Sequence, residues 1–144
     1  MQALTADQYA RLHQLAEAWR HGHLKAAKRD SRFNPRLGAD ALCFQPHRLE
    51  DGRGGLLGAL ITPVSLSLVL VLDETAVPRS ETERLTLSLP SGRYPFMLEF
   101  LGEADWWWRC ELLADLSDVG SLQEASRLAQ QLMERVMTPA APSP

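Results

Sequence analysis

Four histidines and two cysteines are the residues of this chain that could bind a metal or act as nucleophiles. His21 and His23 stand two positions apart near His13, and Cys43 and His47 follow further along the chain. Residues two apart on a helix point in different directions, so this spacing does not supply the converging ligands of a zinc site. We therefore expect solvated or capping histidines and no resident metal.

The sequence also lacks the patterns of nucleophilic catalysis and phosphate binding. It contains no Gly-x-Ser-x-Gly elbow, and neither Cys43 nor Cys110 has a histidine in a known catalytic arrangement. The glycine-rich run 52–55 precedes an expected strand, not the helix N-terminus that a phosphate site uses. The acidic pairs fall in expected loops or strand ends, where carboxylates are normally solvated. We predict that the protein is not an enzyme and requires no cofactor.

Three consecutive tryptophans, Trp106, Trp107 and Trp108, are the unusual feature of the sequence. Neighbouring side chains of a strand face opposite sides, so we expect that the three cannot all be core. The alternation predicts that Trp106 and Trp108 point inward, while Trp107 lies outward on the same side as Glu111. Two interpretations of Trp107 follow: it packs beneath a terminal helix, or it is an exposed aromatic anchor for a partner.

Length and composition indicate one ordinary globular domain of 144 residues, with 45% hydrophobic and 23% charged residues. The net charge of -3 argues against nucleic-acid binding. Residues 1–50 hold 8 Lys/Arg against 5 Asp/Glu, while residues 51–144 hold 7 against 13, so a basic head precedes an acidic body. We expect a cytoplasmic protein, because the N-terminus lacks the apolar core of a signal peptide and cysteines are few.

Two amphipathic helices are predicted at the ends of the chain. Thr5 and Gln8 form a capping box, and an apolar stripe that includes Leu12 and Trp19 follows, with Gly22 expected to end or bend the helix. Ser121 with Glu124 begins a second helix that stops near residues 138–139. Leu128 and Leu132 should be buried with Leu12, Leu15 and Trp19. We expect one domain over residues 1–138 and a disordered tail at 139–144.

Between these helices the hydrophobic period changes to two, which is typical of strands. The uncharged run 56–72 is interrupted by Pro63, so we interpret it as buried sheet and expect no stable membrane insertion. Pro90-Ser91-Gly92 should connect two strands as a hairpin. The expected strands are 41–45, 56–61, 64–72, one around 84–89, one carrying residues 94–100, and 106–113. The pattern predicts an α+β fold with an antiparallel sheet of five or six strands packed by both helices.

Four short motifs occur along the chain in a characteristic order. They are Asn34-Pro35-Arg36-Leu37, Gly58-Ala59-Leu60-Ile61-Thr62-Pro63, Leu89-Pro90-Ser91-Gly92 followed by Phe96, and Cys110-Glu111-Leu112 ahead of the C-terminal helix. In this order, over residues 33–130, the sequence resembles the HybE-type nickel-iron hydrogenase assembly chaperones. It departs from the family pattern at Val64, where the family usually has Trp, and over residues 110–115, where the family usually has Cys-Ser-Leu-Phe-Ser-Pro.

The resemblance implies a cytoplasmic chaperone that binds hydrogenase subunit precursors during maturation, before export. Its expected partners are the small-subunit precursor with its twin-arginine signal and, as a second candidate, the large subunit. We expect contact at the turns containing Thr62 and Pro63, and Pro90 and Gly92, and at a surface near Trp107. Glu103 and Glu111 would steer a basic signal peptide. The alternative is a small-molecule-binding protein or small enzyme with a pocket between sheet and helices.

Overall fold

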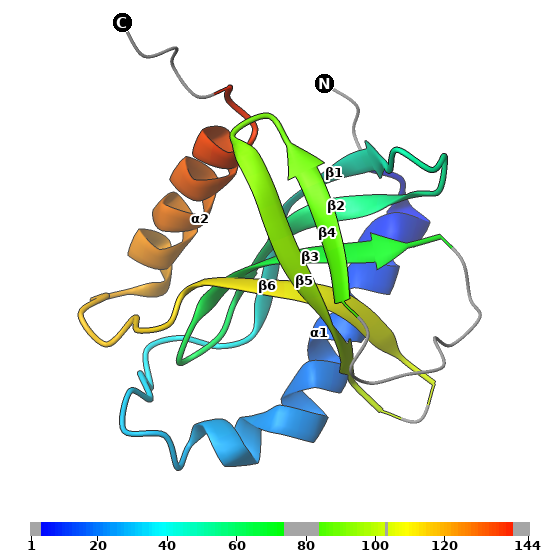
Figure 1. Ribbon diagram of the computed structural model, residues 1–144. Coiled ribbons are helices and arrows are strands. Elements are labelled where there is room, and N and C mark those ends of the chain that lie inside the picture. Colours follow the sequence, from blue (N-terminus) through cyan, green and yellow to red (C-terminus); the bar gives the residue numbers. More distant parts are fainter. Residues whose placement is uncertain (1–3, 74–83, 103, 140–144) are drawn as a thin grey trace, which may run out of the picture.

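The computed structural model describes residues 4–73, 84–102 and 104–139. Figure 1 shows the elements in chain order: α1 (Ala6–Ala27), β1 (Asp40–Arg48), β2 (Gly54–Ile61), β3 (Leu66–Leu72), β4 (Arg84–Leu89), β5 (Gly92–Phe100), β6 (Trp106–Leu113) and α2 (Leu122–Val136). The six strands form one antiparallel sheet in the order β1-β2-β3-β6-β5-β4. The α+β fold predicted from the sequence is therefore confirmed, with β1 and β4 as the edge strands.

Both helices begin at the predicted caps. The Thr5 hydroxyl accepts a hydrogen bond from the Gln8 backbone N–H at 3.1 Å, and the Gln8 side chain accepts from the Thr5 N–H at 2.8 Å. The Ser121 hydroxyl accepts from Glu124 N–H at 3.1 Å. Gly22 does not end α1; a Cβ there would lie 3.3 Å from the carbonyl oxygen of Leu101, so glycine lets the helix pass close to that backbone.

The central strands β2 and β3 are buried on both faces, as the uncharged run 56–72 predicted. On one face, Leu60 and Val69 belong to an apolar cluster with Leu12, Leu15 and Trp19 of α1. On the other face, alternate residues of the same strands pack with α2. This second cluster also includes Leu87 and Leu89 of β4 and Phe96 and Leu98 of β5, which curl over it, together with Ala125, Ala129 and Met133 of α2. Leu128 and Leu132 are only half-buried.

All three consecutive tryptophans are buried, with exposed fractions of 6% for Trp106, 0% for Trp107 and 4% for Trp108. Trp106 and Trp108 point into the α2-side cluster and Trp107 into the α1-side cluster, so the predicted alternation is confirmed. The expectation that they cannot all be core is wrong, because helices cover both faces of the sheet. Neither described helix is long and apolar enough to cross a membrane.

Candidate functional site

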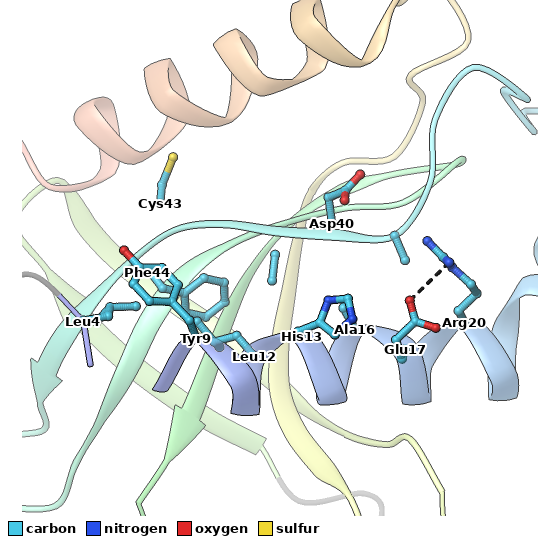
Figure 2. A pocket seen from close by; sticks show the side chains of 12 residues that line it. Leu4, Tyr9, Leu12, His13, Ala16, Glu17, Arg20, Asp40, Cys43 and Phe44 are labelled. Atoms are coloured by element: carbon cyan, nitrogen blue, oxygen red, sulfur yellow. Dashed lines mark ion pairs between the residues drawn. The ribbon is translucent and has the colours of Figure 1, made fainter. Parts of the chain in front are cut away.

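An open cleft lies between α1 and the edge strand β1. It has a volume of about 340 Å³, and its walls come from one face of α1 and from residues 39–44. Figure 2 shows Leu4, Tyr9 and Phe44 gathered at one end of the cleft and Glu17 and Arg20 at the other. The cleft therefore presents an apolar, aromatic end and a charged end, about three helical turns of α1 apart.

A β-bulge in β1 shapes the floor of the apolar end. The register between β1 and β2 shifts between Leu42 and Gln45, and Cys43 has a positive φ of 60°. The Phe44 ring lies against Gly58 of β2, so closely that a Cβ at Gly58 would be 2.3 Å from the ring. The glycine of the Gly58–Pro63 motif thus makes room for an aromatic side chain from the neighbouring strand.

Tyr9 is the most exposed aromatic side chain of the cleft, at 59%. It occupies the fourth helical position, and Leu4 precedes the N-cap, which are the two positions of a hydrophobic staple. Leu4 is buried, whereas most of Tyr9 faces the solvent. Tyr9 therefore offers an apolar surface that residues 4–73, 84–102 and 104–139 do not cover.

The charged end contains two carboxylates and one guanidinium. Arg20 forms an ion pair with Glu17 at 3.2 Å. The Asp40 side chain is half-buried, and within the described residues no hydrogen bond or ion pair holds it. This end of the cleft therefore carries one negative charge in excess, with Asp40 as the free acceptor.

His13 and Cys43 also line the cleft, and among the described residues no hydrogen bond joins either of them to another side chain. Desolvation by nearby protein atoms raises the pKa of the Cys43 thiol, which favours the protonated, unreactive form. Among the described residues, no three His, Cys, Asp or Glu side chains lie close enough together to hold a metal ion. The chemistry that the cleft supports is recognition of an apolar side chain and a cation.

A second polar cluster, which we call the Asn34 junction, joins three loops at a buried position. Asn34 is 2% exposed, and its Nδ2 donates to the carbonyl oxygens of Leu116 and Val119 at 2.9 and 2.8 Å. Its backbone N–H donates to the carbonyl of Pro63 at 2.9 Å, and its Oδ1 accepts from Arg36 N–H at 3.0 Å. The junction thereby ties the α1–β1 connector to the β2–β3 turn and to the β6–α2 loop.

Thr62 and Pro63, which the sequence suggested as partner contacts, are buried beside this junction. The Thr62 hydroxyl accepts from the backbone N–H groups of Ser65 at 3.0 Å and Val64 at 3.2 Å. These bonds close the turn between β2 and β3. Neither residue presents a surface to a partner, so any effect on binding would be indirect.

Pro90 and Gly92 are exposed at the tip of the β4–β5 hairpin, as predicted for a turn. The Ser91 N–H donates to the carbonyl of Val136 at 3.1 Å, and the Ser91 hydroxyl lies 2.6 Å from that of Tyr94. An open groove of about 870 Å³ lies between this tip and the end of α2. These residues remain accessible to a partner.

Of the two interpretations of Trp107, packing beneath a terminal helix is confirmed and the exposed anchor for a partner is wrong. The Trp107 ring is fully buried beneath α1, and its Nε1 donates to the Glu99 carboxylate at 2.7 Å. Glu111 is exposed and lies 3.7 Å from Arg109, while Glu103 is outside the described residues. The structure does not gather the seven predicted residues into one exposed surface, since Thr62, Pro63 and Trp107 belong to the interior.

Comparison with known proteins decides the family. The family model described as NiFe-hydrogenase assembly, chaperone, HybE matches residues 10–144. The chain belongs to the HybE family of NiFe-hydrogenase assembly chaperones. The solution structure of HybE from Escherichia coli is similar to this structure with a TM-score of 0.50 and 24% sequence identity, over 70% of this chain and 67% of that chain. That likeness shows a shared fold, and no curated protein matches the sequence significantly.

None of the HybE-like motif residues lines the open cleft, although Gly58 lies directly beneath it. Asn34 and Pro63 meet in the junction, and Gly58 supports Phe44, so these motif residues have structural roles. The cleft was not predictable from the sequence, because Tyr9 fits the staple position of a capped helix and Asp40 belongs to none of the motifs. The only sequence signal was an aromatic residue on the first turn of a helix, which does not reveal how much of its ring stays exposed.

Proposed function

We propose that this HybE-family protein binds NiFe-hydrogenase subunit precursors in the cytoplasm during maturation and before export. The partners are the small-subunit precursor with its twin-arginine signal and the large subunit. The family match over residues 10–144 carries this proposal. The protein acts as a binding partner and not as an enzyme.

The surface of the structure supports polypeptide recognition. The cleft is open, and the 59% exposure of Tyr9 means that it would not enclose a small molecule. The rival function, a small-molecule-binding protein or enzyme with a pocket between sheet and helices, requires an enclosed site. A polypeptide chain needs only an accessible surface with apolar and charged contacts.

The test is calorimetry with purified small-subunit precursor, the same subunit without its signal, and the large subunit. We expect the wild-type protein to bind the precursor, and to bind the signal-free form more weakly. Binding to neither subunit would refute the proposal. A twin-arginine precursor unrelated to hydrogenases is the matched control, because it separates recognition of the signal from recognition of the hydrogenase.

The other residues that the sequence predicted as partner contacts have the following roles in the proposed binding. Glu103 and Glu111 steer the basic signal peptide, so Glu103→Gln and Glu111→Gln should slow association at low salt and change dissociation little. Pro90 and Gly92 contact the precursor at the hairpin tip. Trp107→Ala should lower stability by roughly 3–5 kcal/mol through loss of a buried ring, and should affect affinity only through partial unfolding.

A further inference from the structure

The edge strand β1 offers main-chain hydrogen-bonding groups beside the cleft. In the described sheet, β1 is paired with β2 on one side and is the end of the strand order on the other. Edge strands present backbone N–H and C=O groups that can pair with an added strand. The first residues of β1, Asp40 and Ala41, line the cleft itself. An extended segment placed along this edge would therefore also contact the cleft.

Two features limit how far such pairing can extend. The bulge with Cys43 at φ 60° interrupts the regular strand after Leu42. Pro46, further along β1, has no backbone N–H to donate. Pairing is thus confined to a short stretch, Asp40–Leu42, which protects the protein from indefinite strand addition. Side-chain contacts must then supply most of the binding free energy and the specificity.

The side chains at the two ends of the cleft define what the segment must carry. Tyr9 and Phe44 line the apolar end, where an aliphatic or aromatic side chain would cover the exposed part of the Tyr9 ring. At the other end, Arg20 is already paired with Glu17, so Asp40 is the carboxylate without a partner in the described chain. Figure 2 shows Asp40 on the side of β1 that faces away from α1, where a segment lying along the edge can reach it. A basic side chain of the bound segment would form an ion pair with the Asp40 carboxylate.

We infer that the cleft and the free edge of β1 bind an extended segment of the hydrogenase subunit precursor. This segment pairs with Asp40–Leu42 and places an apolar side chain against Tyr9 and a basic side chain beside Asp40. The identity of the partner rests on the proposed function, whereas the position and chemistry of the segment come from the cleft. The competing binding mode is an amphipathic helix, which would not form main-chain hydrogen bonds with β1.

The probes are synthetic peptides that tile the small- and large-subunit precursors, measured against wild type, Tyr9→Ala and Asp40→Asn. Tyr9→Ala should weaken the best peptide roughly thirtyfold, the typical effect of losing an interface anchor. Asp40→Asn should weaken it about fivefold, mainly through slower association at low salt. Met97→Ala and Asp118→Asn are matched controls, because they remove an exposed apolar side chain and an exposed carboxylate elsewhere; both should bind as wild type does.

Main-chain pairing is tested with the same peptide N-methylated at alternate backbone positions. One of the two N-methyl registers should abolish binding, and the wild-type amide signals of residues 40–42 should shift on addition of the unmodified peptide. A peptide that gains helicity when bound, or equal tolerance of both registers, would overturn the extended mode. If the precursors bind wild type and the Tyr9 and Asp40 variants equally well, the cleft assignment fails while the proposed function stands. If wild type binds no precursor and no peptide, both fail.

Discussion

The Asn34 junction and the α1–β1 cleft are built in opposite ways. In the junction, a buried amide satisfies two carbonyl groups and joins three loops. In the cleft, Tyr9 is mostly exposed and the half-buried Asp40 has no partner among the described residues. The polar groups of Asn34 are all hydrogen-bonded within the fold, whereas Asp40 in the cleft remains available to a partner.

The difference between the junction and the cleft shows that the family-like motifs indicate the fold and not the binding surface. Asn34 and Thr62-Pro63 of the family-like motifs hold loops together through buried hydrogen bonds, and residues with such bonds are costly to replace. A binding surface need not carry such a signature, since exposed positions tolerate many residue types without loss of the fold. Motifs in the junction therefore identify the fold, and variants in the cleft are the ones that should separate stability from binding.

Between the junction and the cleft, the largest effect is expected from breaking the junction. Asn34→Ala leaves the buried Val119 carbonyl without a donor and removes one of the two donors to the Leu116 carbonyl, which keeps its bond from the Val119 N–H; it should lower the free energy of unfolding by about 2–4 kcal/mol in urea titrations. Asn34→Asp keeps the shape but removes the donors, and should be comparably destabilised. A loss below roughly 1 kcal/mol for both variants would show that the junction does not hold the loops together.

A smaller loss is expected where the fold supports the cleft. Gly58→Ala places a Cβ 2.3 Å from the Phe44 ring, and should cost about 1–3 kcal/mol as the ring is displaced. The same change in a Phe44→Ala background should be much less costly, so a double-mutant cycle isolates the contact. Gly102→Ala, where no atom lies within 4 Å of the added Cβ, is the control. Additive effects in the cycle would contradict the proposed contact.

Acid should weaken the connector that leads into the junction. Hydrogen bonds from Arg32 lower the pKa of Asp30 to about 2 from its ordinary 3.8, and the same guanidinium donates to the Ala114 carbonyl. A lowered folded-state pKa means that this contribution is present above pH 3.8 and is lost as pH falls through about 2. Because the pair is exposed to solvent, we expect a modest effect.

To test this, the free energies of unfolding of wild type and Asp30→Asn are measured by urea titration at several pH values from roughly pH 5 to pH 2, and the difference between the two proteins is compared across this range. The difference should shrink toward zero at the acid end, because the wild-type carboxyl becomes protonated there. A difference that stays constant over this range would exclude the Asp30 carboxylate as its source. High salt at neutral pH should reduce the difference as well.

The smallest effect on stability is expected in the cleft. Tyr9→Ala should change the free energy of unfolding by no more than about 0.5 kcal/mol, because most of the ring is already in water. Thermal and urea unfolding both measure this. A loss of several kcal/mol would mean that Tyr9 serves the fold, and the contrast between the cleft and the junction would disappear.

Local sequence signals predicted most of the elements. The Thr5 capping box and the Ser121 N-cap place the starts of α1 and α2, period-two alternation finds the strands, and the uncharged run 56–72 indicates their burial. The prediction for β1 was too short, since the strand runs from Asp40 to Arg48. Its bulge and Pro46 break the alternation, and an edge strand tolerates both. Gly22 was expected to end or bend α1, yet the helix runs on to Ala27, and a Cβ at position 22 would lie 3.3 Å from the Leu101 carbonyl oxygen.

The candidate site was not predictable in the same way. Thr62, Pro63 and Trp107 were chosen from motifs and residue type, and tertiary packing buries all three. The prediction that Trp107 faces away from Trp106 and Trp108 was correct, because alternation is a property of the strand. The sequence of the strand does not show whether a helix covers that face. Here the face of Trp107 is covered by α1, which lies far from β6 in the sequence.

The amino-acid sequence by itself determined the helix caps, the alternation of the strands, the hairpin at Pro90–Gly92 and the HybE-family motifs, because these depend on neighbours within a few positions. Only the tertiary structure decided that Asn34 meets Pro63, Leu116 and Val119, that Phe44 lies on Gly58, and that Tyr9 and Asp40 line one cleft. The physical reason is that burial and pairing depend on which segments fold against each other. The type of a side chain limits which interactions it can form. The tertiary fold determines whether another part of the same chain already forms them or whether they remain available to a partner.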